Sequence, residues 1–324
     1  KIAPSEGSSL WTSNYNSSKE TTLSWGPYKL ESFQAGKQFK LVKNENWYGY
    51  GLKQYEGQYQ TTAILTDILP DWNSAWLAFR AGQLDGIGID VSIADEYKGS
   101  DRAYFTPDDY VQSMQLQSNV EQLKARETAG INKSILGYED FRKAISLCID
   151  RADFATKTTT SSLAGYGLFN SMHYYDVENG GAYRNTDEAR QVLCDIYAVD
   201  ASNYESLTAA EKAITGYNLD EARKLVTKAY YAALAAGDIG VNDKVLLTFG
   251  SGATTEAVTR RVDYLGNAIK ELCVGTPLEG RIDYEFKDFS TKWVNDFRAG
   301  AYDICMGGWT GAAWDPGYFL LAYL

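Results

Sequence analysis

Hydrophobic and polar residues follow two different periods along the chain. Between residues 25 and 70, the runs GPYKLESFQ, GKQFKLVK and TTAILTDIL alternate apolar and polar positions, and Ala-Gly lies between the first two runs. A period of two is typical of β-strands, and a glycine turn between two such runs is typical of a hairpin. The sequence therefore predicts a hairpin and a third strand here, after an irregular segment at residues 1–24 that is rich in Ser, Asn and Thr.

Helical spacing becomes prominent from residue 138 onward. The segment 138–158 has acidic residues in its first turn and an apolar stripe through Phe141, Ile145 and Ile149, so we expect one helix there. Further helices are expected at residues 186–199, 219–237 and 256–275, and strands at 243–252 and 281–289. Helices that alternate with strands predict an α/β sheet.

One phrase occurs twice. WLAFRAGQLDGIGI begins at Trp76 and WVNDFRAGAYDICMGGW begins at Trp293, and in both copies an Asp follows three residues after Phe-Arg-Ala-Gly. Helical spacing before the Gly, the freedom of Gly to adopt a positive φ, and a short apolar run after the Asp predict a helix, a tight turn and a buried strand. We therefore expect Gly82 and Gly300 each to end a helix, and two similar α/β lobes to explain the repetition.

Composition and charge narrow the classes of function. A chain of 324 residues with 44% apolar residues is longer than one core usually supports, which favours two domains. The net charge is −11, and Lys and Arg are scattered along the chain. Since nucleic-acid binding needs clustered cations that displace phosphate counterions, we expect no nucleic-acid partner. An aromatic content of 14% suits a cleft that holds ligands by stacking and apolar contact.

Residues that usually bind metals or carry catalysis are few. The single histidine, His173, lies in a loop-like stretch without a nucleophile motif, and we interpret it as structural or exposed at the surface. Cys148, Cys194, Cys273 and Cys305 form no C-x-x-C pair, so their spacing indicates no metal site. We expect Cys148, in a helical segment, and Cys305, in a strand, to be buried free thiols. We predict no cofactor, no metal and no catalytic residue.

Several weak motifs occur together in a fixed order. Each resembles a motif of one protein family. GPYKLESF followed by KLVKNENWYG resembles a hairpin of that family, and FRAGQLD resembles one of its helix-to-strand turns. FRKAISLCIDRADF resembles one of its helices, with Arg142, Asp150 and Arg151 in matching places. LDEARKLVTKAY resembles a later helix, and AYDICMGGWTGAAWDPGYFL a signature containing Gly-Trp and Asp-Pro. Over about residues 25–324, the chain is similar to the family 5 extracellular solute-binding proteins of ABC importers, the oligopeptide- and dipeptide-binding group.

The resemblance implies an α/β fold of the type II periplasmic-binding-protein kind, with parts of two lobes whose mixed sheets are flanked by helices. Residues 1–110 would form the later part of lobe one, residues 111–120 a crossover, and residues 121–324 lobe two without its C-terminal end. Family members are considerably longer and carry an N-terminal half before the hairpin. We therefore interpret the chain as a fragment that lacks this half and the C-terminal end, with the signal sequence outside it.

The resemblance also implies a function in uptake. Family members capture a peptide in the cleft between two lobes, close by hinge motion and deliver the peptide to a membrane permease. This implies a monomeric, non-enzymatic protein outside the cytoplasm, in the periplasm or as a cell-surface lipoprotein. Ligands of open α/β sheets bind at the carboxyl ends of strands. The expected ligand contacts are Ile89 and Asp90 from lobe one, Gln115 and Gln117 from the crossover, and Met306, Gly308, Trp309, Thr310 and Ala312 from lobe two.

One position departs from the family pattern. Peptide binders that resemble this chain often carry an Asp, which pairs with the α-ammonium of the peptide, where this sequence has Ala312. A buried ammonium without a counter-charge costs on the order of several kcal/mol, which leaves alternatives to a peptide open. One is a sugar or metal chelate on the same fold, although a single histidine disfavours the chelate. The other is a surface hydrolase with Asp303 and Asp315 as paired carboxylates, but Asp303 is explained as a turn residue.

Overall fold

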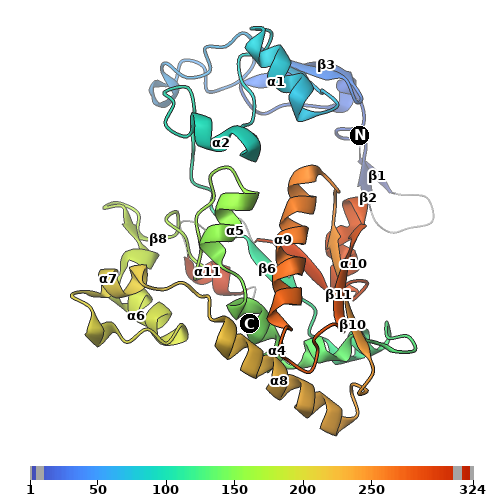
Figure 1. Ribbon diagram of the computed structural model, residues 1–324. Coiled ribbons are helices and arrows are strands. Elements are labelled where there is room, and N and C mark those ends of the chain that lie inside the picture. The colour runs from blue at the N-terminus through green and yellow to red at the C-terminus, as the bar shows by residue number, and fades with distance from the viewer. Residues whose placement is uncertain (1, 5–10, 309–315, 322–324) are drawn as a thin grey trace. The chain divides into compact units, whose positions relative to one another are not determined.

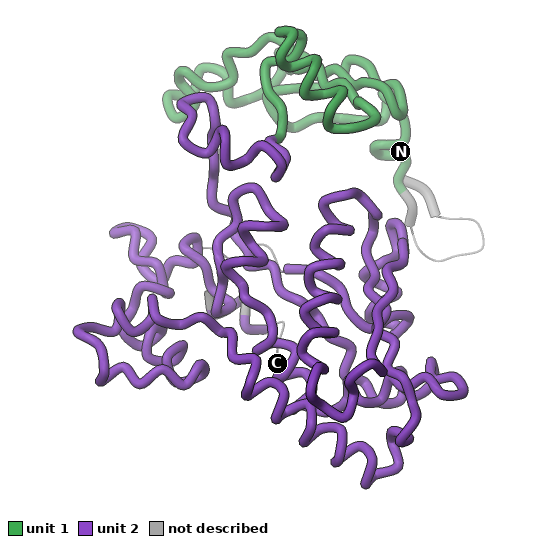
Figure 2. Tube along the Cα trace, viewed as in Figure 1, with its two compact units in different colours: residues 1–88 green, residues 89–324 purple. Residues whose placement is uncertain are grey.

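The computed structural model describes residues 2–4, 11–308 and 316–321, which fall into two compact units (Figure 2). Unit 1 comprises residues 1–88 and unit 2 comprises residues 89–324. The lobe limits expected at residues 110 and 120 remain predictions, because a compact unit is defined by packing and a lobe by its motion. Within the described ranges, no helix is long and apolar enough to cross a membrane.

Unit 1 contains an antiparallel sheet of β3 (Tyr28–Gln34), β4 (Gln38–Lys43) and β5 (Ala63–Asp67). Strands β3 and β4 form the predicted hairpin, whose turn includes Gly36 at a φ of 70°. The third predicted strand is β5. Helix α1 (Trp72–Arg80) follows it. The hairpin and the third strand are therefore confirmed.

The beginning of unit 1 differs from the prediction. The segment expected to be irregular contains β1 (Ile2–Pro4) and β2 (Trp11–Ser13), which pair antiparallel (Figure 1). Two short strands need only main-chain hydrogen bonds to pair, so a polar composition does not prevent it. Two turns of 3-10 helix, η1 (Lys19–Thr21) and η2 (Lys53–Tyr55), complete the described elements of unit 1.

Unit 1 buries little apolar surface. Among its described residues, Trp47 is the only apolar side chain that is more than nine-tenths buried. Its ring packs against those of Tyr50, Tyr55 and Tyr59, with centroids 4.9–5.0 Å apart. In the sheet, by contrast, Phe33 remains 61% exposed. Small domains depend on burying most of their apolar surface, so unit 1 has little core of its own.

Unit 2 is built on a mixed five-stranded sheet. Strands β10 (Lys244–Ser251), β11 (Ile282–Asp288) and β12 (Ile304–Gly307) run parallel in the order β11-β10-β12. Strand β6 (Ser113–Leu116) pairs antiparallel with β12, and the short β7 (Ile131–Asn132) pairs with the beginning of β10. Helices flank this sheet (Figure 1), so the predicted α/β fold with a mixed sheet is confirmed.

The central strand β10 is buried on both faces. On one face its apolar residues join the main hydrophobic cluster with α4 (Glu139–Leu147), α8 (Leu219–Ala236) and α9 (Glu256–Leu272). On the other face the ring of Tyr302 lies against Gly250, where any side chain would collide with it. Burial on both faces is characteristic of parallel strands and explains the apolar run VLLTF.

The segment predicted as one helix forms two. Helix α4 ends at Leu147, and α5 (Arg151–Thr158) begins after Asp150. The Asp150 carboxylate accepts hydrogen bonds from two main-chain N–H groups in the first turn of α5, at 3.1 and 3.0 Å. This is N-cap geometry, and it marks a helix start in the middle of the segment. The prediction of one helix is wrong because an apolar stripe continues across a break when both helices face the same core.

The other predicted helices are confirmed as α6 (Asp187–Ile196), α8 and α9, and α8 ends at Gly237 with a φ of 76°. An excursion between α5 and α8 has a small cluster of its own around Cys194, Ala210 and Ile214. The further described elements of unit 2 are α2 (Val91–Tyr97), α3 (Val120–Lys124), η3 (Ser134–Gly137), β8 (Tyr174–Asp176), β9 (Gly181–Ala182), η4 (Tyr183–Asn185), α6 (Asp187–Ile196), η5 (Ala201–Asn203), α7 (Leu207–Lys212), η6 (Ser290–Lys292), α10 (Trp293–Arg298) and α11 (Pro316–Leu320).

Both copies of the repeated phrase end a helix in the same turn. After α1, Gly82 and the next residue donate main-chain hydrogen bonds to the carbonyls three and five positions earlier, at 2.9 and 3.0 Å. After α10, Gly300 and the next residue do the same, at 2.9 and 2.8 Å. The φ angles of these glycines are 73° and 79°. The prediction that each glycine ends a helix is confirmed.

The segments after the two turns differ. The strand predicted after Asp303 is β12, but the segment GIGI after Asp85 forms no strand. Glycines weaken a strand, and no described strand lies beside GIGI to supply hydrogen bonds. The prediction of a strand there is therefore wrong for the described chain.

All four cysteines are buried and free, as predicted for Cys148 and Cys305. Burial raises the pKa of the Cys148 thiol to about 12 and that of the Cys305 thiol to about 11. Because the thiolate is the reactive form, we expect both thiols to resist a thiol reagent in the folded protein at neutral pH and to react after denaturation without reductant. Thiol counting in both states tests this, and fewer than two free thiols in the denatured protein would contradict it.

Candidate functional site

The carboxyl end of β12 and its neighbour β6 bring three of the predicted site residues together. In the antiparallel ladder, Gln115 lies opposite Cys305, and Met306 lies opposite Met114. Gly308 follows directly after β12. Because parallel strands of open α/β sheets bind ligands where they end, this edge is a candidate binding site.

Side-chain and main-chain groups at this edge are held by short contacts. The Nε2 of Gln115 donates to the Oγ of Ser113 at 2.5 Å, and this hydroxyl donates to the carbonyl of Gly307 at 3.3 Å. A Cβ atom at Gly308 would lie 2.5 Å from the ring of Tyr110. Glycine at this position therefore permits the close approach of the segment that precedes β6.

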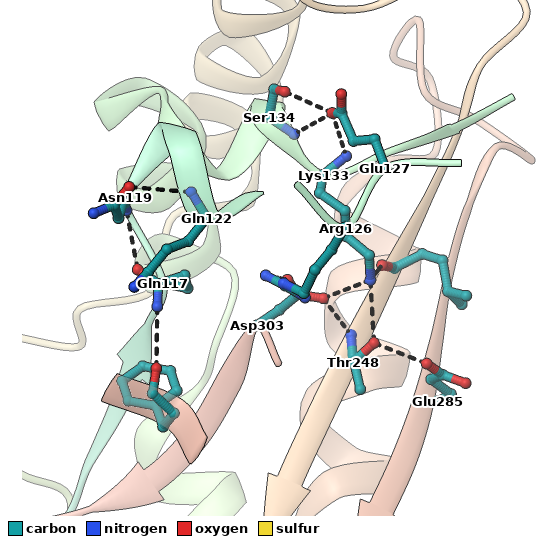
Figure 3. A network of polar contacts seen from close by, with 12 residues as sticks. Gln117, Asn119, Gln122, Arg126, Glu127, Lys133, Ser134, Thr248, Glu285 and Asp303 are labelled. Carbon is teal, nitrogen blue, oxygen red and sulfur yellow. Dashed lines mark hydrogen bonds and ion pairs between the residues drawn. The ribbon is translucent and has the colours of Figure 1, made fainter. Parts of the chain in front are cut away.

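Gln117 lies further along the crossover and is already engaged. Its side chain is buried, its Nε2 donates to the carbonyl of Phe297 at 3.2 Å, and its Oε1 accepts from the N–H of Asn119 at 3.0 Å. The Nε2 of Gln122 reaches the carbonyl of Arg298 at 3.3 Å. These bonds fasten the crossover and the start of α3 to the end of α10; Figure 3 shows those made by Gln117. A ligand contact by Gln117 remains a prediction.

Asp303 lies at the centre of a buried charge network (Figure 3). Its side chain is 0% exposed, and its two oxygens contact the guanidinium of Arg126 at 2.6 Å and the Nζ of Lys133 at 2.7 Å. The main-chain N–H of Thr248 donates to the same carboxylate at 2.7 Å. Asp303 lies in the bend between α10 and β12, as the interpretation as a turn residue expects, but that interpretation does not account for the burial and bonding of its carboxylate. Its carboxylate joins β10 and β12 to the segment between α3 and η3, which contains Arg126 and Lys133.

Two further carboxylates complete the network. Glu127 accepts hydrogen bonds from the main-chain N–H groups of Lys133 and Ser134 at 2.9 and 2.8 Å. Glu285 accepts a bond from the Oγ1 of Thr248 at 2.8 Å, and that hydroxyl also contacts the Nζ of Lys133 at 3.1 Å. Burial opposes ionisation of Glu285, yet hydrogen bonds from Lys287 and Thr248 and the charge of Lys133 hold its pKa below the usual value. Within the network, the ionised form of Glu285 is therefore favoured.

Sequence reasoning missed the partners of Asp303. Arg126 and Lys133 lie more than 150 residues before it, and no local spacing connects them. The sequence does place these two basic residues close to apolar segments. That pattern indicates a buried charge but does not identify the residue that pairs with it.

The two predicted residues from lobe one lie at the start of unit 2. Ile89 is half-buried, and Asp90 is the N-cap of α2, where it accepts from the N–H and Oγ of Ser92 at 2.9 and 2.7 Å. Burial opposes ionisation of Asp90, but the hydrogen bonds from Ser92 and the positive charge of Arg260 outweigh it and hold its pKa below the usual value. The carboxylate is thus charged but already bonded.

A small cavity lies beside α2. Its volume is about 140 Å³, and it lies between α2 and the segment that begins with α5. Its lining is mostly hydroxyl groups and small apolar side chains, from Val91, Ala94, Asp95, Lys98, Ala152, Ala155, Thr156, Thr159, Thr160, Ser161, Ser162, Leu163 and Ala164. Such a lining can bind uncharged polar groups.

Four positions named by the sequence lie outside the described residues: Trp309, Thr310 and Ala312 of the predicted site, and Asp315 of the hydrolase alternative. The structure therefore describes six of the nine predicted ligand contacts, all of them in unit 2. Gln115, Met306 and Gly308 are gathered on one ladder, whereas Gln117 and Asp90 make their own protein contacts. Within the described part of the chain, no group of three His, Cys, Asp or Glu residues could hold a metal ion.

Residues 5–324 match the sequence model of the bacterial extracellular solute-binding proteins, family 5 middle. The chain belongs to this family. Family 5 consists of non-catalytic solute-binding proteins, so the hydrolase alternative is wrong. The full burial of Asp303 between two cations agrees with this, since a surface catalytic acid would have to be accessible. A search of curated protein sequences found no significant match.

Solved structures with the same fold include other solute-binding proteins. A substrate-binding domain of an oligopeptide ABC transporter from Bacillus anthracis is 17% identical, with a TM-score of 0.62 over 92% of this chain and 48% of its own. A periplasmic oligopeptide-binding protein from Borrelia burgdorferi is 19% identical, with a TM-score of 0.57, and the match covers 94% of this chain and 49% of that protein. OppA from Haemophilus influenzae is 16% identical, with a TM-score of 0.57, and the match covers 92% of this chain and 48% of OppA. This family 5 chain thus spans about half the length of the structures it matches.

Proposed function

We propose that this chain is part of the substrate-binding component of an ABC importer, which captures a peptide or peptide-like solute and delivers it to a membrane permease. The observation that carries this proposal is the family 5 match over residues 5–324. In support, the structure from Haemophilus influenzae is described as a complex with the peptide RPPGFSPFR. The protein would act outside the cytoplasm, as a periplasmic protein or a surface lipoprotein, in agreement with the extracellular family description.

The proposed ligand contacts follow from the chemistry of the edge formed by β6 and β12. The amide of Gln115 can exchange its bond to Ser113 for a bond to a ligand, because both groups are partly accessible. Met306 offers a flexible apolar surface, and Gly308 leaves main-chain groups open to a peptide backbone. Ile89, Asp90, Gln117, Trp309, Thr310 and Ala312 complete the proposed set, with closure of the two lobes around the ligand.

The identity of the ligand tests the proposal. Native mass spectrometry of the full-length protein, isolated from the cells that produce it, is expected to show a bound peptide. A co-purified sugar or metal chelate would overturn the peptide proposal and favour the second candidate, a non-peptide solute. The observation in favour of that candidate is that Asp90, the only acid among the described site residues, is already bonded to Ser92.

Replacing Gln115 with Ala is expected to weaken binding of the co-purified ligand by about tenfold. The loss of one hydrogen bond costs about 1.5 kcal/mol, which corresponds to about a tenfold higher dissociation constant. Calorimetry on the full-length protein measures the change. Gln54→Ala, at an exposed glutamine of unit 1, is the matched control and should leave the affinity unchanged. Equal affinities of the two variants would remove Gln115 from the site.

A further inference from the structure

The excursion between α5 and α8, residues 159–218, holds the chain that leads into β6. It contains β8, α6 and α7 (Figure 1), and Asn170 lies in the loop before β8. The Nδ2 of Asn170 donates hydrogen bonds to the main-chain carbonyls of Asp108 at 2.7 Å and Tyr110 at 3.0 Å. The excursion is therefore fastened to the segment directly before the expected crossover at residues 111–120.

The other half of this amide is fixed within the excursion. The Oδ1 of Asn170 accepts a hydrogen bond from the main-chain N–H of Met172 at 2.9 Å and lies 3.0 Å from the Nδ1 of His173. His173 is fully buried, and its ring packs edge-on against that of Phe169, with centroids 5.3 Å apart. Because both the oxygen and the nitrogen of the amide have partners, its orientation is set by the loop that carries it.

The segment held by Asn170 contacts the candidate site on its other side. A Cβ atom at Gly308 would lie 2.5 Å from the ring of Tyr110 and 2.9 Å from the carbonyl of Val111. On the side of the excursion, a Cβ atom at Gly165 would lie 3.2 Å from the Cγ1 of Val111. Residues 108–111 therefore lie between the excursion and the end of β12, and a shift of these residues would change the surroundings of Gly308.

Main-chain hydrogen bonds do not hold this segment in place. Within the described residues, no main-chain N–H of residues 105–112 donates to another main-chain group. Regular pairing begins only at Ser113, the first residue of β6. A segment of this kind opens easily unless side chains hold it, and the two bonds from Asn170 supply such a hold.

We propose that Asn170 is a positioning residue of the candidate binding site, which holds residues 108–111 against the end of β12 and thereby slows the release of a bound solute. The inference rests on the proposed function, because it assigns the excursion a part in retaining the solute. A site whose walls are already held in the bound geometry loses less conformational freedom on binding. Differences of this kind act mainly on the rate of dissociation.

Limited proteolysis of the 324-residue chain tests the positioning. Chymotrypsin cleaves after Tyr110, at the carbonyl that accepts a bond from Asn170. Asn170→Asp keeps the shape of the side chain but removes both N–H donors, so we expect cleavage after Tyr110 to become about tenfold faster. Cleavage after Tyr104, which is 86% exposed, is the internal reference and should not change. An unchanged rate of cleavage after Tyr110, measured by mass spectrometry of the first products, would overturn the proposal.

Two further variants separate positioning from a general effect on folding. Asn185→Asp makes the same substitution at an exposed asparagine of the excursion and should match the wild type. Asn170→Gln retains the N–H donors on a longer side chain and is expected to recover part of the protection at Tyr110. Faster cleavage of Asn170→Asp after Tyr204, within the excursion, would show that the excursion itself unfolds and would contradict a positioning role.

Retention is measured on the full-length protein. Each variant is loaded with a tryptic digest of casein, from which the protein selects peptides, and native mass spectrometry follows the peptides that stay bound in peptide-free buffer. We expect release about tenfold faster from Asn170→Asp than from the wild type, and an unchanged rate for Asn185→Asp. Equal release from Asn170→Asp and the wild type would overturn the proposal. A wild-type protein that retains no peptide would contradict the proposed function instead, and cleavage after Tyr110 would still decide whether Asn170 holds the segment.

Discussion

Replacing Asp303 with Asn is expected to lower the free energy of unfolding by about 3–5 kcal/mol, the usual cost of breaking a buried ion pair from one side. The carboxylate is fully buried and accepts bonds from Arg126, Lys133 and the N–H of Thr248. Asn keeps the shape of the side chain but removes its charge. Lys133, which is 6% exposed at its side chain, would then remain in the interior without the carboxylate that contacts its Nζ.

Urea unfolding of the 324-residue chain measures this effect, with the slope of the transition checked for a change in cooperativity. The matched control is Asp85→Asn, which makes the same substitution in the other copy of the phrase. As an exposed position without a described partner, it should change stability by less than about 0.5 kcal/mol. The triple variant Asp303→Leu, Lys133→Met and Arg126→Met should recover part of the loss, since a buried charge group can be replaced by apolar side chains. If both Asn variants changed the free energy of unfolding by the same small amount, the charge network around Asp303 would not stabilise the sheet of unit 2.

Replacing Ala312 with Asp in the full-length protein is expected to tighten the binding of a peptide with a free amine by about 10–100-fold. A charge-assisted contact contributes about 1.5–3 kcal/mol, which corresponds to that range of dissociation constants. Peptide binders that resemble this chain often carry an Asp at this place, and Asp90 is already bonded to Ser92 at the start of α2. The new carboxylate would therefore supply an anchor for the α-ammonium of the peptide.

The opposite result is expected if the natural ligand is neutral or blocked at its amine. The same substitution would then bury an unpaired carboxylate, which weakens binding or raises the pKa of the new side chain. Calorimetry on the wild type and the variant, with one peptide and its N-acetylated form, separates the two cases. A wild-type protein that already prefers the free amine by about tenfold or more would show that another residue anchors it, and our account of Ala312 would be wrong.

Local chemistry made much of this fold predictable. The alternation at residues 26–43 gives the hairpin, and the glycines at 82, 237 and 300 end their helices because only a residue without Cβ adopts their φ easily. The break between α4 and α5 was also encoded locally, by Asp150 as an N-cap. It was missed because the apolar stripe is a stronger signal than a single capping residue.

Features that depend on distant partners could not be predicted in the same way. The segment after Asp85 has the composition of a buried strand, but a strand exists only where another one pairs with it. The environment of Asp303 depends on residues that precede it by more than 150 positions. For the candidate site, the resemblance named Gln115, Met306 and Gly308, and the structure places them on or directly after the paired strands β6 and β12; spacing alone did not connect them, and their contact with a ligand remains a prediction.

The pairing of β6 with β12 has a consequence for biosynthesis. Leu116 lies opposite Ile304, so the sheet of unit 2 can close only after almost the whole unit has left the ribosome. At about 5–20 residues per second, the first strand waits on the order of 10–40 s for its partner. Non-local pairing of this kind also folds slowly once the chain is complete. Over that interval the nascent polypeptide stays open, and an open chain is the form that a secretion channel can thread.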